Sequence, residues 1–215
     1  MPLTAVVIPA LNCQATLERV LAEIPEGHLV LVVDDGSREP LRAPVRVLRH
    51  PVNRGYGAAQ KTGYAAALDA GAERIVLLHG DGQYDTADTL GLASGLADAE
   101  AVLGSRFLSD PRVIPGWRRV GNRALTGLAN ARFGARHSEL HTGARAFRAS
   151  ALRELPLARF SDDYLFDQQV LCGLLRARRR IAERPVRVRY DGTVQSISFG
   201  RSVAYGLGCV WEILR

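Results

Sequence analysis

The first half of the chain alternates short, wholly apolar runs with segments whose apolar residues recur at helical spacing. A run without polar alternation is typical of a strand that is covered on both faces of its sheet. Strands are therefore predicted at residues 5–8, 29–33, 45–48, 75–78 and 101–103.

The segments between these runs follow the helical period. Apolar residues three and four positions apart occupy residues 17–24, an alanine-rich stretch covers 58–70, and a third helix is predicted near 86–98. Strands that alternate with helices indicate parallel strand–helix–strand units. The predicted fold class is therefore α/β, with a mostly parallel sheet flanked by helices.

The second half has a different pattern. A helix rich in arginine is predicted over residues 117–133 and another over 163–178, whereas 184–190 has the pattern of an extended segment. Residues 202–214 are mostly apolar and are interrupted by two glycines. Because neither a linker nor an internal repeat separates the halves, we predict one domain over residues 1–215.

The composition favours a globular protein with anionic ligands. The 215 residues are 47% hydrophobic and 23% charged, with a net charge of +6 and a pI of about 9.7. Lys61 is the only lysine, so nearly all cations are arginine, whose planar guanidinium suits phosphate. Phosphorylated ligands and anionic lipid are both compatible with this charge, and nucleic acid ranks last because no nucleic-acid-binding motif is present.

The sequence also bears on the compartment. No apolar run reaches the roughly 18 residues that span a membrane, and the N-terminal residues lack the features of a secretory signal. Cys13, Cys172 and Cys209 form no paired pattern, which favours reduced thiols. We therefore expect a cytoplasmic protein.

Three of the apolar runs end in polar clusters, at residues 9–12, 34–37 and 79–85. In open α/β sheets, ligands bind beyond the carboxyl ends of the strands. One cluster alone would be an ordinary turn, because Gly, Asp and Asn are common turn residues. Three on one predicted edge favour a nucleotide-type site, although no GxGxxG follows the first run and no GxxxxGK[ST] loop occurs.

The cluster at residues 79–85 has the composition of a metal-bound phosphate site. Mg²⁺ and Mn²⁺ prefer oxygen ligands and are commonly held by one or two carboxylates together with the phosphates of a substrate. The segment carries Asp81 and Asp85 beside two glycines, which permit a close approach of the backbone to a ligand.

Seven segments occur in a characteristic order along the chain: Val7–Asn12, Val32–Ser37, Asn53–Ala59, Asp81–Gln83, Gly104–Phe107, His141–Phe147 and Ser161–Asp163. In this order the chain resembles family 2 glycosyltransferases of the GT-A fold. Within that family it is most similar to the dolichyl-phosphate mannose and polyprenyl-phosphate glucose synthases. The resemblance covers nearly the whole chain.

The resemblance implies that residues 1–108 bind a nucleotide sugar and that residues 109–215 bind the acceptor. In such enzymes the segment after the first strand and the acidic pair after the second hold the base and ribose of a UDP- or GDP-sugar. For the acidic pair, a helix cap or a turn is the alternative role. The positions assigned to the donor are Pro9, Leu11, Asn12, Asp34, Asp35, Gly55 and Lys61.

The family's metal triad, Asp-x-Asp-x-Gln, maps onto His79, Asp81 and Gln83, so a histidine replaces the first carboxylate. A neutral imidazole can ligate Mn²⁺ but suits Mg²⁺ poorly. We expect Asp81 and Gln83 to hold a divalent cation, Mg²⁺ or Mn²⁺, largely together with phosphate oxygens. Cys13 is a second departure, because relatives usually carry glutamate there.

The resemblance also implies the catalytic and acceptor residues. Arg106 matches an arginine that faces the diphosphate or the acceptor phosphate. Asp163 is the candidate general base or acceptor-positioning group, with a helix cap as its alternative role. A solvated helix face is the competing role for the helical arginines. The predicted acceptor and phosphate contacts are Arg118, Arg119, Arg145, Asp162, Arg189 and Ser196.

The implied activity is the transfer of a sugar from a nucleotide-diphosphate donor to a polyprenyl phosphate. One alternative is transfer to a hydroxyl of a lipid, polysaccharide or small molecule. Another is a nonenzymatic binding protein of GT-A ancestry, which the departures at residues 13 and 79 favour.

Residues 199–211 resemble the stretch that leads towards the membrane in relatives. Tyr205 and Trp211 lie near arginines in the sequence and suit a membrane interface. A C-terminal helix packed on the core is the alternative. Since the chain ends at Arg215, we expect no transmembrane anchor and a peripheral contact with the cytoplasmic face of a membrane.

Overall fold

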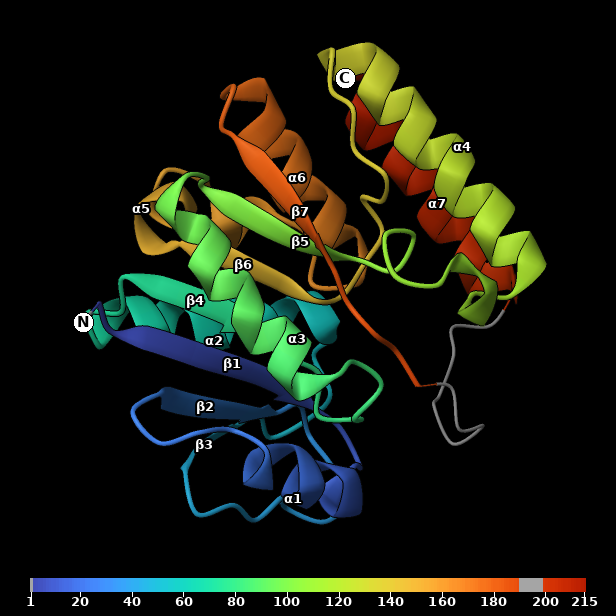
Figure 1. Cartoon of the computed structure of the whole chain (residues 1–215). Coiled ribbons are helices and arrows are strands. Elements are labelled where there is room, and N and C mark those ends of the chain that lie inside the picture. The colour runs from blue at the N-terminus through green and yellow to red at the C-terminus, as the bar shows by residue number, and fades with distance from the viewer. Residues whose placement is uncertain (1, 190–198) are drawn as a thin grey trace.

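The computed structural model describes residues 2–189 and 199–215 (Figure 1). Within these residues, seven strands form one sheet in the order β3–β2–β1–β4–β6–β5–β7. The strands are β1 (Thr4–Ala10), β2 (Leu29–Asp34), β3 (Arg46–Arg49), β4 (Arg74–Leu77), β5 (Ala101–Ser105), β6 (Arg145–Arg148) and β7 (Ile181–Pro185).

Helices connect and cover the strands. They are α1 (Gln14–Ala22), α2 (Tyr56–Asp69), α3 (Thr86–Gly91), α4 (Gly116–Phe133), α5 (Ala149–Arg153), α6 (Leu165–Arg176) and α7 (Phe199–Leu214), with short 3-10 helices at Leu92–Ala97, Pro111–Val113 and Leu157–Arg159. The helix predicted near 86–98 is divided: the α-helix ends at Gly91 and a 3-10 helix continues from Leu92.

The sheet is mostly parallel, as predicted. Strand β1 pairs in parallel with β2 and β4, β2 with β3, and β5 with β7. The exception is β6, which lies antiparallel between β4 and β5 and was not predicted as a strand. Because β6 is antiparallel to both neighbours, β4 and β5 run in the same direction.

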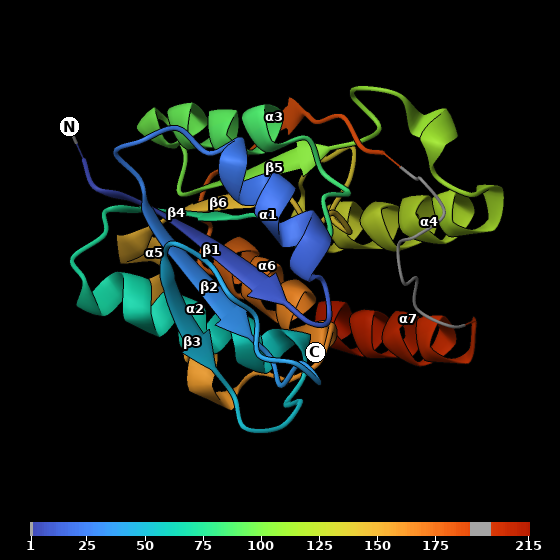
Figure 2. The same ribbon diagram turned by 90° about the horizontal axis from the view of Figure 1, so that it is seen from below.

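Both faces of the sheet are covered, which explains why the strands are continuously apolar. Ala5 and Val7 of β1 pack into the core that α2 and α6 cover, whereas Val6 and Ile8 pack into the core that α1 covers. Figure 2 shows the sheet between these two layers, with α1 and α3 on one side and α2, α5 and α6 on the other.

Helices α4 and α7 lie side by side and extend beyond the sheet (Figures 1 and 2). A buried cluster of Leu103, Ala129, Leu171 and Ile213 joins them to β5 and α6. The segment 199–214 is thus a helix packed on the core on one side. Among the described helices, none combines the length and the hydropathy needed to cross a membrane.

Candidate active site

The carboxyl ends of β1, β2, β4 and β5 lie at one edge of the sheet, because these four strands run in the same direction. The polar clusters that follow β1 and β2 touch one another: the Asn12 backbone N–H donates to Ser37 Oγ at 2.8 Å, and the Arg38 N–H donates to Asn12 Oδ1 at 2.9 Å. The predicted meeting of the clusters at one edge is therefore observed.

The segment after β1 presents an apolar surface beside this polar junction. Asn12 has a φ of 51°, a left-handed conformation that asparagine tolerates better than most residues. Its side chain and its backbone both bond to the loop that follows β2. Pro9 is half-buried and Leu11 is exposed, so Leu11 is the residue of this segment with the most accessible apolar surface.

Asp34 is fully buried and anchors its own loop. Its carboxylate accepts hydrogen bonds from the backbone N–H groups of Ser37 at 2.9 Å and Leu41 at 3.1 Å, and from Arg49 Nη1 at 2.9 Å. Burial alone would raise the pKa of Asp34, but these hydrogen bonds and the Arg49 charge lower it below its usual value. These bonds give Asp34 a role in its own loop, and its contact with a nucleotide stays a prediction.

Asp35 anchors the loop that precedes α2. Its carboxylate lies 2.7 Å from His50 Nδ1 and accepts the backbone N–H groups of Arg54 and Gly55, both at 2.9 Å. The other ring nitrogen of His50 lies 2.8 Å from Thr62 Oγ1 on α2. Asp35 therefore holds the 50–55 segment in place, and its contact with a ribose stays a prediction.

Gly55 is required because another loop lies against it. It has a φ of 107°, and a Cβ at this position would stand 2.4 Å from the carbonyl oxygen of Asp162. That carbonyl accepts the Ala58 N–H at the start of α2. Gly55 thus allows the loop carrying Asp162 and Asp163 to reach the functional edge of the sheet.

Lys61 and Asp162 form an ion pair within the protein. Lys61 Nζ donates to Asp162 Oδ1 at 2.9 Å and to the Phe160 carbonyl at 2.5 Å. Hydrogen bonding to Lys61 lowers the pKa of Asp162. Their predicted contacts with donor and acceptor therefore compete with an internal ion pair. The neighbouring Asp163 is exposed, and its Oδ1 accepts only the adjacent Tyr164 N–H among the described residues.

The predicted metal motif lies in the loop after β4. Asp81 Oδ1 accepts the Gln83 N–H at 2.9 Å, whereas Oδ2 has no hydrogen bond to a described residue. Residues 2–189 and 199–215 contain no group of three or more His, Cys, Asp or Glu side chains that could hold a metal. The free oxygen of Asp81 fits a cation that takes its other ligands from a bound diphosphate.

His79 belongs to a group of rings rather than to a cluster of carboxylates. Its Nε2 lies 2.8 Å from the Tyr56 hydroxyl, and its ring centroid lies 5.5 Å from that of Tyr56 and 5.3 Å from that of Tyr84. Tyr164, next to Asp163, stacks on Tyr56 at 5.3 Å. These contacts bring the Asp163 loop and the metal motif to the same part of the site.

Arg106 stands at the end of β5 and is held by Glu139. Its Nε donates to Glu139 Oε1 at 2.9 Å, its Nη2 donates to the same oxygen, and its backbone N–H donates to Oε2 at 2.7 Å. Asn122 on α4 also donates to Glu139 Oε1, at 2.7 Å. Glu139 and Asn122 were not predicted as site residues, and the only signal in the sequence is that Glu139 lies two residues before the 141–147 segment.

Arg145 does not lie where a phosphate contact was predicted. Its side chain is 1% exposed and donates to the carbonyls of Thr142 and Asp167, with Nη2 3.3 Å from the Asp167 carboxylate. The reason is its position as the first residue of β6, where the buried register turns the side chain towards α6. The predicted phosphate contact therefore finds no support.

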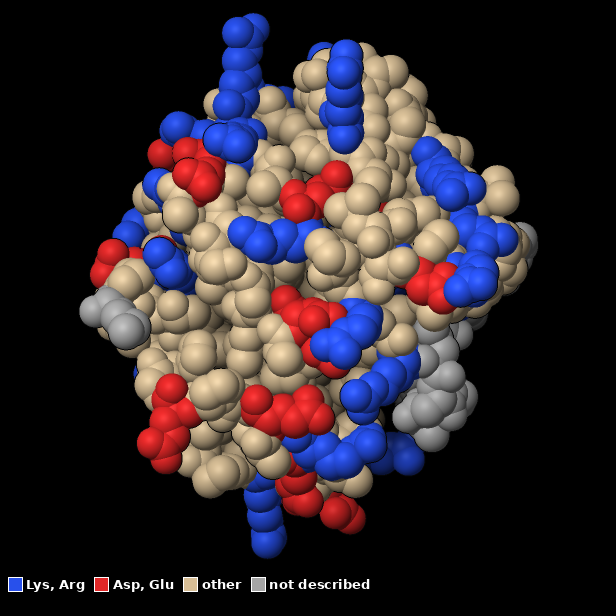
Figure 3. Space-filling model, in the orientation of Figure 1, with Lys and Arg blue, Asp and Glu red and all other residues tan. Residues whose placement is uncertain are grey.

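The remaining predicted arginines lie near the surface. Arg118 is half-buried over the Trp117 ring, and Arg119 donates to the Pro111 carbonyl at 3.4 Å. Arg189 is exposed, and its backbone N–H donates to the Gln83 carbonyl at 2.8 Å, beside the metal motif. Figure 3 shows cationic side chains along the outer edge that α4 occupies. Ser196 lies outside the described residues.

His141 connects this region to α7. Its Nδ1 lies 3.0 Å from the Tyr205 hydroxyl, and its carbonyl accepts Arg106 Nη2 at 2.8 Å. Burial, with added repulsion from Arg145 and Arg106, lowers the pKa of His141 to about 3. The imidazole is therefore neutral at physiological pH.

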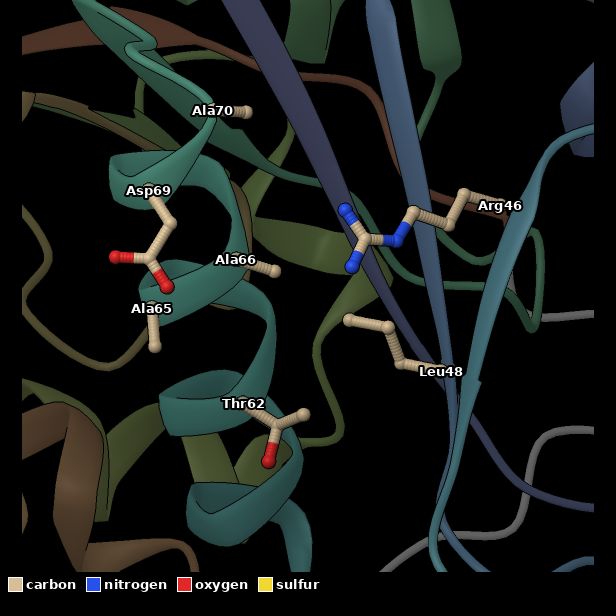
Figure 4. A pocket seen from close by; sticks show the side chains of 7 residues that line it. All are labelled: Arg46, Leu48, Thr62, Ala65, Ala66, Asp69 and Ala70. Atoms are coloured by element: carbon tan, nitrogen blue, oxygen red, sulfur yellow. The ribbon is translucent and has the colours of Figure 1, made fainter.

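A surface hollow of about 480 Å³ lies elsewhere, between β3 and α2. Figure 4 shows Arg46 reaching from β3 towards α2 across this hollow. Its lining includes Leu48, Ala65, Ala66 and Asp69, and none of the predicted site residues. Its chemistry is less suited to a phosphorylated ligand than the polar edge described above.

Comparison with known proteins places the chain in a family. The sequence model described as "Glycosyl transferase family 2" matches residues 5–156. The UDP-N-acetylglucosamine–dolichyl-phosphate N-acetylglucosaminyltransferase of Methanococcus voltae is 24% identical over 236 residues, covering 97% of this chain and 93% of the relative. An uncharacterised protein of Methanocaldococcus jannaschii is 26% identical, covering 97% and 90% respectively.

Solved structures share the fold. Glucosyl-3-phosphoglycerate synthase from Mycobacterium tuberculosis, in complex with UDP, superposes with a TM-score of 0.71 at 20% identity, covering 99% of this chain and 79% of that chain. A complex of the same synthase with Mn²⁺, UDP-glucose and phosphoglyceric acid gives a TM-score of 0.70, also at 20% identity and with the same coverage. The chain therefore has the GT-A fold of these glycosyltransferases.

Proposed function

Because the chain belongs to glycosyl transferase family 2, we propose that it transfers a sugar from a nucleotide-diphosphate donor to a polyprenyl phosphate at a membrane surface. The observation that carries the acceptor assignment is an exposed apolar surface on α4 and α7, next to the functional edge of the sheet. The similarity to a dolichyl-phosphate N-acetylglucosaminyltransferase supports the same assignment.

The donor is proposed to bind across the ends of β1, β2 and β4. Pro9 and Leu11 offer apolar surface for a base, and the buried Asp34 and Asp35 fix the loops on either side of it. The donor is a UDP- or GDP-sugar, with UDP preferred because the M. tuberculosis synthase binds UDP and UDP-glucose.

The diphosphate is proposed to lie between the Asp81 loop and Arg106. Asp81 and Gln83 would hold Mn²⁺ or Mg²⁺, and such a cation neutralises the negative charge that develops on the departing nucleotide. Arg106 is pre-positioned by Glu139, so it can stabilise the same charge without reorganising. Arg189, beside Gln83, supplies an exposed cation.

The acceptor surface is amphipathic. On α7, Val203, Leu207, Trp211 and Leu214 form a stripe at helical spacing and are between 49% and 69% exposed. Trp117 and Val120 of α4 add exposed apolar surface, and Arg118, Arg119 and Arg123 lie on the same helix. Exposed aromatic and aliphatic residues with nearby arginines suit the interface of an anionic membrane.

This surface is connected to the reaction centre from both helices. Asn122 of α4 donates to the carboxylate that holds Arg106, and Tyr205 of α7 lies 3.0 Å from His141. A lipid whose chain lies along α4 and α7 would therefore present its phosphate near Arg106. A phosphate acceptor is already ionised at neutral pH, so it needs orientation rather than a general base.

A hydroxyl acceptor is the second candidate. The observation in its favour is the exposed carboxylate of Asp163, which is linked to the metal motif through Tyr164, Tyr56 and His79 and could accept a proton. The M. tuberculosis synthase, whose fold is shared, binds phosphoglyceric acid.

The test supplies radiolabelled UDP- and GDP-sugars with Mn²⁺ and either polyprenyl phosphate in anionic vesicles or 3-phosphoglycerate in solution. We expect label in the lipid phase and vesicle-dependent turnover. A Leu207→Glu variant should lose this turnover at least about tenfold, because a charge in the stripe opposes insertion. The matched control, Leu3→Glu, carries the same change at another exposed leucine and should retain it.

Label only in phosphoglycerate would assign the second candidate instead. Equal lipid glycosylation by wild-type protein and Leu207→Glu would contradict the membrane surface while leaving the transferase activity in place.

A further inference from the structure

His79 stands where the family carries a carboxylate, and its ring is closed in on one side. A Cβ placed on Gly143 would stand 2.5 Å from His79 Nε2 and 2.6 Å from its Cε1. The backbone at residue 143 therefore packs directly against the Nε2 side of the imidazole. The edge of Tyr84 faces the same ring, with centroids 5.3 Å apart.

The position of Gly143 is itself fixed. Its N–H donates to the Tyr84 hydroxyl at 2.8 Å, and Thr142 before it donates from Oγ1 to the Gly104 carbonyl at 2.6 Å. These bonds hold the Gly143 backbone against His79. A cation could not approach Nε2 without displacing both this backbone and the Tyr56 hydroxyl.

The direction of the Tyr56–His79 hydrogen bond determines which nitrogen of His79 carries the proton. Tyr56 is a phenol that is protonated at neutral pH, and its hydroxyl has one partner among the described residues, His79 Nε2. If the phenol donates this bond, Nε2 is the acceptor. In a neutral imidazole the proton then resides on Nδ1, which has no partner among the described residues.

This arrangement does not suit a metal ligand. A neutral histidine ligates through the nitrogen that lacks a proton, and here that nitrogen is occupied by Tyr56 and covered by Gly143. With the proton on Nδ1, the nitrogen that remains accessible can only donate. The predicted role of His79 as a metal ligand therefore disagrees with the geometry of its surroundings.

We propose that His79 donates a hydrogen bond from Nδ1–H to an anionic oxygen of the donor diphosphate, and that Tyr56 is the positioning residue that sets this tautomer. The proposal rests on the proposed function for the identity of the diphosphate, but the tautomer assignment does not. A neutral donor in place of a carboxylate removes one negative charge beside the leaving group. The cation then depends on Asp81, Gln83 and the phosphates.

The tautomer can be read without activity, from long-range ¹H–¹⁵N correlations of ¹⁵N-histidine-labelled protein at pH 8. The His79 signals are assigned by comparison with a His79→Gln variant. We expect Nδ1 to be the protonated nitrogen in the wild-type protein. In Tyr56→Phe the Nδ1–H to Nε2–H ratio should fall about tenfold, because the hydrogen bond that selects it is lost.

Tyr84→Phe is the matched control, because Tyr84 contacts the same ring but its hydroxyl bonds to Gly143 and not to His79. It should keep the wild-type tautomer. A wild-type protein with hydrogen on Nε2, or a Tyr56→Phe protein with an unchanged ratio, would overturn the assignment. A merely structural role of Tyr56 would change stability without changing this ratio.

The ligand half of the proposal is tested by adding UDP with Mn²⁺ to the same samples. We expect the Nδ1–H signal to move downfield and its exchange with solvent to slow. UDP binding in calorimetry with an unchanged Nδ1–H signal would refute the contact with the diphosphate. No UDP binding would refute the proposed function and this contact together. The tautomer assignment is measured without ligand, so it would stand or fall on its own result.

Discussion

The guanidinium of Arg106 lies against the fully buried carboxylate of Glu139, where β5 ends. Two nitrogens of Arg106 donate to one carboxylate oxygen, and the Arg106 backbone N–H donates to the other. Asn122 completes the set from α4. A charge held in this way is already oriented before a ligand arrives, which is the condition for electrostatic stabilisation of a leaving group.

Replacing Glu139 should therefore affect both stability and turnover. Glu139→Gln leaves the Arg106 charge without its partner, so we expect a loss of about 3 kcal/mol in the free energy of unfolding. The sugar-transfer rate should fall more than the donor affinity. Urea unfolding and steady-state kinetics measure the two effects.

The control is Glu154→Gln, which breaks the exposed ion pair with Arg179. It should cost less than about 1 kcal/mol and leave turnover unchanged. Similar losses in both variants would contradict the special position of Glu139.

Asp81 should account for the metal dependence. Asp81→Asn removes the one carboxylate oxygen of the motif that is free for a cation, so we expect turnover to fall at least about 100-fold. Mn²⁺ should no longer increase the affinity for UDP in calorimetry. Asp85→Asn is the matched control and should keep the metal dependence. Asp85 caps α3 by accepting the Asp88 N–H, and asparagine caps helices equally well. Metal dependence that survives Asp81→Asn would contradict the assignment of Asp81 as a metal ligand.

A substitution at Asp163 distinguishes between the two candidate acceptors. A phosphate acceptor brings no proton to remove, so Asp163→Asn should lower lipid glycosylation by about tenfold or less. A hydroxyl acceptor needs a general base, and the same change should then cost about 10²- to 10⁴-fold. The measurement is the rate with each acceptor. A loss of the larger size with polyprenyl phosphate would contradict a mechanism without a base.

His141 should make the protein less stable in mild acid. The unfolded chain protonates this residue near pH 6.5, whereas the folded chain keeps it neutral to about pH 3. Between these values the unfolded state binds more protons, so the free energy of unfolding falls as the pH falls.

From pH 7 to pH 5, wild-type protein should lose about 2 kcal/mol more than His141→Gln, measured by urea unfolding at both values. This window lies above the usual titration range of carboxylates. His28→Gln, at a surface position, should behave like wild-type protein. An identical pH dependence in wild-type protein and His141→Gln would show that His141 is not the cause.

Much of the fold could be predicted because the strands that build it are continuously apolar. The exception, β6, is four residues long with an arginine at each end, and only its pairing with β4 and β5 defines it. The same pairing turns Arg145 inward. A short segment of this composition contains no signal for either outcome.

The location of the site could be predicted more readily than the contacts within it. Parallel strands bring their carboxyl ends to one edge, so the meeting of Asn12 with Ser37 followed from the pattern. Pairs such as Lys61 with Asp162, 101 positions apart, did not follow, because no local pattern specifies them. Asp34 has the same residue type whether it binds a nucleotide or anchors a loop, so the loop contacts that it makes could not be predicted from the sequence.

The most direct test of the proposed function is a calorimetric screen of UDP- and GDP-sugars against wild-type protein and Asp81→Ala, with and without Mn²⁺. We expect the wild-type protein to bind at least one nucleotide sugar more tightly with Mn²⁺, and Asp81→Ala to lose that gain. Absence of metal-dependent affinity for every UDP- and GDP-sugar would contradict the proposed function.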